Sequence, residues 1–138
     1  MAKTTTMQVE IRFGDCDPAG IVYFPRYFEW FDACTQALFA RAGLKKAEII
    51  ESYGAAGIPL VAARARFVMP STFGDEVAID TSVTAWHRSS FDVHHRLFRG
   101  EALAVEGFET RVWTVRDSSA PTGLRSSPVP REVIDRFA

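Results

Sequence analysis

The sequence has little cysteine, no long apolar run and no excess of one charge. Its two cysteines, Cys16 and Cys34, form neither a disulfide framework nor a metal-ligand spacing, which predicts free thiols in a reducing cytoplasm. A net charge of −1, with no long run of one sign, argues against nucleic acid or a membrane surface as the main partner. No stretch is long enough to span a bilayer, and the first residues, MAKTTTMQVE, lack the apolar run of a signal peptide. A small anionic ligand remains compatible, because it needs only a few well-placed Arg or Lys side chains.

What the chain does have is the composition of one globular domain. With 47% hydrophobic and 24% charged residues, we expect a single domain over residues 1–138 with one core. Residues 6–13 alternate between polar and apolar, which predicts a first strand. After a loop, Pro25 suits the first position of a helix, where its missing N–H would have no partner. The helix expected over 25–42 has an apolar stripe made of Tyr27, Trp30, Phe31, Cys34 and Leu38.

In the second half of the chain the apolar period changes to two, which is typical of strands. Gly107 inside the last of these runs indicates a bulge. Strands are expected over 61–69, 77–85, 91–99 and 103–115, and short helices over 45–54 and 130–138. One long apolar helix against such strands predicts an α+β fold, in which an antiparallel sheet of about five strands wraps around one central helix.

The segment between the first strand and the long helix carries the most specific pattern. It reads GDCDPAGIVYFP, with Asp15 and Asp17 before a Pro-Ala-Gly turn and Tyr27 in step behind it. With the later segments RFVMPSTFGDEVAIDTSVTAW and RSSF, it resembles the hotdog-fold acyl-CoA thioesterases of the 4-hydroxybenzoyl-CoA thioesterase type. The resemblance covers essentially the whole chain and implies the hotdog fold.

The resemblance also implies roles for single residues. The second aspartate of the pair, Asp17, corresponds to the family's catalytic carboxylate. The start of the long helix would polarise the thioester carbonyl through the backbone N–H of Phe24, helped by that of Tyr23. Gly20 would let the backbone approach the substrate without a Cβ in the way. The family further implies sites formed between subunits, in a dimer that usually pairs again to a tetramer.

The residues themselves leave the role of the acidic pair open. An ionised Asp17 can attack the carbonyl directly or activate water as a general base. Both aspartates can also simply cap a turn, and we interpret Asp15 as structural, bonded to backbone or to an arginine. Cys16 is a poor nucleophile here, because two acidic neighbours raise the pKa of a thiol. Glu29 or Asp32 on the long helix is the alternative catalyst, since another hotdog branch takes its carboxylate from that helix.

The coenzyme A half of such a substrate carries several negative charges and needs cationic or N–H donors. Arg88, with His87 and Ser89 beside it, is the best candidate for the phosphate contacts, and Arg64 on another strand comes next. Related sequences have a denser basic cluster where this chain has His87-Arg88-Ser89-Ser90, so this assignment departs from the family pattern.

The three histidines do not predict a metal site. His94 and His95 are adjacent on a strand and point to opposite faces, so they do not share one metal ion. We expect them, with His87, at the surface or at an interface, and we expect no metal or redox cofactor.

The sequence thus predicts a homo-oligomeric acyl-CoA thioesterase that releases an aromatic or short acyl acid from CoA. Two alternatives remain. A hotdog hydratase or dehydratase would rely on a histidine with an acidic partner, and none lies near Asp17 in the sequence. A CoA-thioester-binding protein without catalysis would keep the groove and release no thiol.

Overall fold

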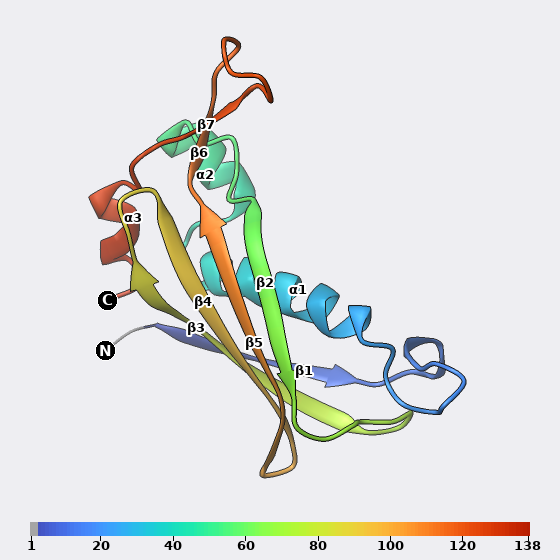
Figure 1. The fold of residues 1–138 in the computed structure, drawn as a ribbon. Helices are drawn as coiled ribbons and strands as arrows, with labels where there is room; N and C mark the ends of the chain where they lie inside the picture. Colours follow the sequence, from blue (N-terminus) through green and yellow to red (C-terminus); the bar gives the residue numbers. More distant parts are fainter. Residues whose placement is uncertain (1–2) are drawn as a thin grey trace.

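The computed structural model describes residues 3–138, and its main feature is a five-stranded antiparallel sheet. The strands lie in the order β1-β3-β4-β5-β2, and α1 crosses one face of the sheet (Figure 1). The predicted α+β architecture around one long helix is confirmed. The sheet consists of β1 (Thr4–Glu10), β2 (Leu60–Phe67), β3 (Glu76–Trp86), β4 (Ser90–Arg99) and β5 (Ala102–Val112).

The helices follow the predicted order, and α1 (Pro25–Arg41) begins at the expected proline. It ends at Arg41 because the next residues turn back, with the Ala42 amide bonded to carbonyls of the last turn and Gly43 at φ +77°. The remaining helices are α2 (Lys46–Tyr53), α3 (Arg131–Asp135) and the one-turn 3₁₀ helix η1 (Phe13–Asp15). Among the described residues, no helix is long and apolar enough to cross a membrane.

Three local predictions were wrong. The first strand ends at Glu10, because residues 13–15 turn into η1. The last long strand is interrupted at Trp113, and a separate two-stranded ribbon follows, formed by β6 (Thr114–Arg116) and β7 (Leu124–Ser126). Gly107 is regularly paired with His95 and Ala65 and forms no bulge. A Cβ at Gly107 would lie 2.5 Å from the Phe31 ring, so this glycine makes room for the helix.

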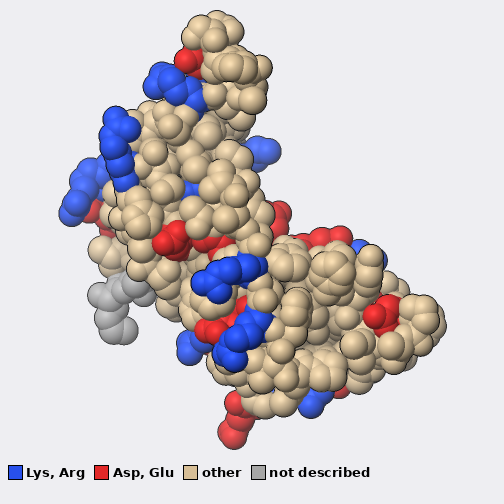
Figure 2. Space-filling view, viewed as in Figure 1, with Lys and Arg blue, Asp and Glu red and all other residues tan. Residues whose placement is uncertain are grey.

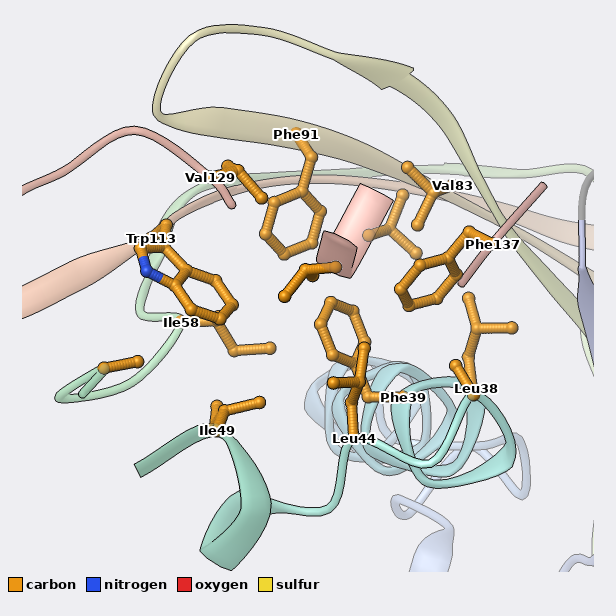
Figure 3. Close-up of a cluster of buried hydrophobic side chains, with 14 residues drawn as sticks. Leu38, Phe39, Leu44, Ile49, Ile58, Val83, Phe91, Trp113, Val129 and Phe137 are labelled. Carbon is orange, nitrogen blue, oxygen red and sulfur yellow. The ribbon is translucent and has the colours of Figure 1, made fainter. Parts of the chain in front are cut away.

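The core has two parts, one under each half of α1. The first half of α1 packs with residues of β3, β4 and β5, and the second half packs with α2, α3, β4 and Trp113, the residue after β5. The side chains of the second cluster converge in Figure 3, with Leu38 and Phe39 of α1 facing Phe91 and Phe137. The fully or nearly buried residues of the first cluster are Ile11, Val22, Tyr27, Phe31, Cys34, Val77, Ile79, Leu97, Ala104 and Val105.

Strand β2 differs from the other strands because most of it is exposed. It lies at the edge of the sheet and pairs only with β5. Its apolar side chains are open to solvent, with Leu60 46%, Val61 60% and Phe67 51% exposed. The alternation of polar and apolar residues in β2 therefore does not correspond to one buried and one exposed face within a single chain.

Candidate active site

The two aspartates of the acidic pair lie on a tight hairpin directly before α1. Cys16 and Val22 form an antiparallel bridge. The Asp17 amide donates to the Ile21 carbonyl at 2.9 Å, and the Gly20 amide donates to the Asp17 carbonyl at 2.9 Å. Gly20 has φ +85°, a left-handed conformation that closes the turn and favours glycine. The Asp-Pro-Ala-Gly sequence is thus explained by turn geometry.

The carboxylate of Asp17 is half-buried and only partly used by this turn. Its Oδ1 accepts the Ala19 N–H at 2.9 Å. Within residues 3–138, no other hydrogen bond or ion pair to this carboxylate is found, so Oδ2 remains available. The turn-capping interpretation of Asp17 is therefore correct, and it leaves one oxygen free for chemistry.

Asp15 has a different environment. Its Oδ2 accepts the Arg12 amide at 2.9 Å, and its Oδ1 lies 3.3 Å from Nε of Arg26. Arg26 also donates to the Gly14 carbonyl at 3.3 Å. The prediction that Asp15 is bonded to backbone or to an arginine is confirmed, since both contacts are present.

The backbone at the start of α1 offers one open donor. The Tyr23 amide donates to the Asp15 carbonyl at 2.8 Å, so the expectation that it would help to bind a carbonyl oxygen is wrong. The Phe24 amide, in contrast, has no acceptor within the described part of the chain. A free N–H at a helix N-terminus, where the helix dipole is positive, attracts a developing negative charge.

An apolar groove of about 340 Å³ begins beside this donor. Phe24 and Tyr27 at the start of α1 line it, together with Phe67 of β2 and the residues that follow this strand. In Figure 2 the end of the molecule that carries the hairpin has few charged groups on its surface. The complete lining is Ile21, Val22, Phe24, Tyr27, Phe67, Val68, Met69 and Pro70.

Neither thiol is placed for nucleophilic attack. The Cys16 Sγ points back to the Arg12 carbonyl at 3.8 Å. Cys34 is fully buried on α1, and burial raises the pKa of its thiol to about 11. The prediction that Cys34 belongs to the core is confirmed.

A buried charged cluster under α1 was missed at the level of sequence. The imidazole of His95 is fully buried and lies 3.2 Å from Glu109, so the prediction that His95 is at the surface was wrong. Glu109 also accepts from Thr35 at 2.8 Å and from Arg111 at 2.8 Å. Arg111 reaches Asp32 at 2.7 Å. The period of two puts Glu109 and Arg111 on the same face as Gly107, which was the available signal.

The alternative catalysts on α1 are both held by arginines. Asp32 is bound by the buried Arg111, and Glu29 lies 3.1 Å from Arg26. Neither is on the hairpin that carries Asp17.

The comparisons with known proteins agree with this geometry. A family model described as the thioesterase-like superfamily matches residues 11–137. The chain belongs to this superfamily. A 4-hydroxybenzoyl-CoA thioesterase from Pseudomonas sp. (strain CBS-3) is 37% identical over 141 residues, 98% of each chain. A 1,4-dihydroxy-2-naphthoyl-CoA hydrolase from Synechococcus sp. (strain WH7803) is 31% identical over 93% of this chain and 84% of the relative.

A solved structure is similar over the whole thioesterase fold. It is a mutant 4-hydroxybenzoyl-CoA thioesterase, with an aspartate changed to asparagine, complexed with 4-hydroxybenzoyl-CoA. The TM-score is 0.88 at 34% identity, and the match covers 99% of this chain and 100% of that one. The predicted hotdog fold, the family and the class of enzyme, a thioester hydrolase, are thereby confirmed.

The residues predicted to bind CoA in this thioesterase are not all brought together. Arg88 and Ser89 lie in the turn between β3 and β4, and the Arg88 carbonyl accepts the Val129 amide at 2.9 Å. Of the described carboxylates, none pairs with the exposed Arg88, whereas His87 is 3.1 Å from Asp92. Arg64 sits over the Phe108 ring at 4.0 Å, in register with His94. His94 lies four residues into β4 from its start at Ser90, or roughly 13 Å, so Arg64 is set back along the sheet from the turn that holds Arg88.

Proposed function

We propose that this chain hydrolyses aromatic acyl-CoA thioesters of the 4-hydroxybenzoyl-CoA type, with Asp17 as the catalytic carboxylate. The observation that carries the proposal is that an oxygen of Asp17 and the amide of Phe24, both in the segment directly before α1, have no partner among the described residues, and that Phe24 lines an apolar groove. A thioester needs a nucleophile or base and a donor for its oxyanion, and these two groups supply both.

In the proposed reaction the thioester carbonyl oxygen accepts the Phe24 N–H. A preorganised donor of this kind is typically worth about 3–4 kcal/mol in the transition state. Asp17 then acts in one of two ways. It attacks the carbonyl carbon, giving a mixed anhydride and CoA thiolate, and water hydrolyses the anhydride. Alternatively it takes a proton from a water molecule that attacks the same carbon.

Two features support an aromatic acyl group. Three aromatic side chains, Phe24, Tyr27 and Phe67, line the groove. Aromatic rings gain about 0.5–1.5 kcal/mol from such neighbours beyond the burial of area. The named relatives act on 4-hydroxybenzoyl-CoA and 1,4-dihydroxy-2-naphthoyl-CoA, both hydroxyaryl thioesters.

Arg88 is the proposed contact for the CoA phosphates, since it is exposed and has no carboxylate partner within residues 3–138. His87 and Ser89 flank it in the same turn. The segment after β7 runs beside this turn, since the Trp113 amide donates to the Ser89 carbonyl and the Ser127 amide to the Trp113 carbonyl. Arg125 of β7, which reasoning from sequence missed, therefore joins the proposed cationic group. Its pairing with Asp117 at 3.2 Å makes it the weaker member.

We also propose that two chains pair through β2, in a dimer that pairs again. An edge strand presents unpaired N–H and C=O groups to a further strand. Antiparallel pairing with β2 of a second copy would satisfy them symmetrically and cover Val61 and Phe67. Val61→Lys would place a charge in each half of this apolar contact, and sedimentation velocity should show a smaller species than wild type. The free thiols suit the cytoplasm as the place of action.

The positions of the histidines do not support the hydratase alternative. Each histidine has an acidic partner, His95 with Glu109 in the core, His87 with Asp92 and His94 with Glu106. None of the three lines the groove beside Phe24 or lies on the hairpin that carries Asp17.

The test is thiol release by wild-type protein from 4-hydroxybenzoyl-, benzoyl-, phenylacetyl-, acetyl- and palmitoyl-CoA. The proposal predicts the highest kcat/KM for the hydroxylated aryl thioester. Preference for an aliphatic acyl-CoA would overturn the aromatic assignment. Binding of 4-hydroxybenzoyl-CoA without thiol release would leave the chain as a binding protein.

A further inference from the structure

The hairpin that carries Asp17 is hydrogen-bonded to residues 71–75, a segment that follows β2. The Val22 amide donates to the Ser71 carbonyl at 3.0 Å, and Ile21 forms an antiparallel bridge with Thr72. The Thr72 hydroxyl donates to the Gly20 carbonyl at 2.8 Å. Residues about 50 positions apart in the chain thus meet at the proposed catalytic turn (Figure 1), as the 52-residue separation of the last pair shows.

Gly20 is the residue of this turn whose backbone conformation is least restricted. Its φ of +85° is one of several values that glycine adopts easily. A Cβ built at Gly20 would meet nothing within 4 Å, so packing does not hold this residue. The direction of the Gly20 carbonyl is therefore set by hydrogen bonding. Two backbone hydrogen bonds shape the turn, from the Asp17 amide to the Ile21 carbonyl and from the Gly20 amide to the Asp17 carbonyl. Both change if the peptide group between Gly20 and Ile21 rotates.

Thr72 is itself firmly anchored. Its amide donates to the Asp75 carboxylate at 3.0 Å, and the Asp75 amide returns a bond to the Thr72 carbonyl at 3.0 Å. The Asp75 carbonyl and the Gly74 amide both bond the backbone of Ile11, at 2.9 and 3.0 Å. Ile11 is fully buried in the core. The hydroxyl thus belongs to a platform that is fixed to the interior at the end of β1.

We propose that Thr72 is a positioning residue for the thioesterase reaction. Its hydroxyl fixes the Gly20 carbonyl, keeps the turn in one conformation and so aims the free oxygen of Asp17 at the thioester. Water can replace the hydroxyl as a donor, but it does not fix the direction of the carbonyl. This inference rests on the proposed function of Asp17. A misplaced catalytic group lowers the rate of the chemical step and leaves the binding of CoA unchanged.

The test compares Thr72→Val, which keeps the shape and removes the hydroxyl, with Thr72→Ser, which keeps the hydroxyl. With 4-hydroxybenzoyl-CoA, Thr72→Val should lower kcat about tenfold with KM within about twofold of wild type. Thr72→Ser should restore kcat to within about twofold of wild type. Thr6→Val is the matched control, because it removes a surface hydroxyl that bonds Asp80 at 2.7 Å and should not change kcat. Unchanged kcat in Thr72→Val, or equal losses in the Val and Ser variants, would overturn the proposal.

A second readout separates this inference from the proposed function. Amide hydrogen exchange at Asp17 and Gly20, followed by NMR, should accelerate about tenfold in Thr72→Val and not in Thr72→Ser or Thr6→Val, because the turn opens more often. If wild type releases no thiol, the proposed function fails, and faster exchange would still establish that Thr72 holds the turn. Unchanged exchange would overturn the role of Thr72 whatever the activity of wild type.

Discussion

Asp17 and Glu109 are both carboxylates beside α1, and they differ in how their oxygens are used. Glu109 is almost fully buried, and Thr35, His95 and Arg111 surround it with donors. Asp17 lies on a hairpin and has one donor among the residues that the structure describes, the Ala19 amide. The first carboxylate is saturated and contributes to folding, whereas the second keeps an oxygen free for an outside partner. The number of protein donors around each carboxylate therefore separates the structural acid from the one that we propose to react.

The largest expected effect is a loss of stability when the charge of the buried Glu109 is removed. Glu109→Gln leaves the buried Arg111 without its one buried counter-charge among the described residues, and breaking a buried pair costs about 3–5 kcal/mol of unfolding free energy. Urea denaturation measures this loss. Glu106→Gln is the matched control on the same strand, where the carboxylate pairs with Arg66 and His94 on the other face of the sheet. A loss in Glu109→Gln no greater than in the control would contradict the structural role.

The same carboxylate predicts how stability depends on pH. Burial raises the pKa of Glu109, but the hydrogen bonds from His95 and Arg111 and their charges outweigh it and hold the pKa below its ordinary 4.5. A carboxyl whose pKa is lower in the folded state adds stability above its unfolded pKa and loses it as the pH falls through the folded value. Unfolding free energy should therefore decline below pH 4.5 in wild type. Glu109→Gln should show a shallower decline over the same pH range, and an equal slope would contradict the assignment.

The smallest expected effect concerns the CoA end of the site. Arg88→Ala removes one exposed cation, so KM for 4-hydroxybenzoyl-CoA should rise roughly threefold with kcat unchanged. The increase should shrink at high salt, because screening already weakens the contact. The matched substrate is the same acyl group on N-acetylcysteamine, which lacks the phosphates and should show no change. An equal effect on both thioesters would remove Arg88 from the phosphate site.

Features set by local sequence were predictable. Pro25 at the start of the helix, the alternation in the strands and the Asp-Pro-Ala-Gly turn all depend on neighbouring residues. Features set by contacts between distant segments were not. Gly107 fits the pattern of a bulge, and only the position of the Phe31 ring explains why a Cβ is excluded there.

The same distinction applies to the candidate site. Asp17 and the Phe24 amide follow from the motif and from the start of the helix. The Tyr23 amide is not open to substrate because it donates to the Asp15 carbonyl. This bond depends on how the hairpin folds, and the spacing of residues in the sequence does not reveal it. The burial of His95 depends on a partner from another strand, Glu109, and on Thr35 from the helix. The exposure of the apolar side chains of β2 could not be predicted, because it depends on the strand order that puts β2 at the edge of the sheet.

The central claim is that the free oxygen of Asp17 performs the chemistry. The most direct measurement is kcat of Asp17→Asn with 4-hydroxybenzoyl-CoA, beside its thermal unfolding midpoint. Asparagine keeps the side-chain oxygen that accepts the Ala19 amide, so the unfolding midpoint should not change. The account predicts a loss in kcat of at least about a hundredfold, the scale of a catalytic acid–base group. An Asp17→Asn variant that folds and keeps its rate would contradict the account and reduce Asp17 to the capping residue of a turn.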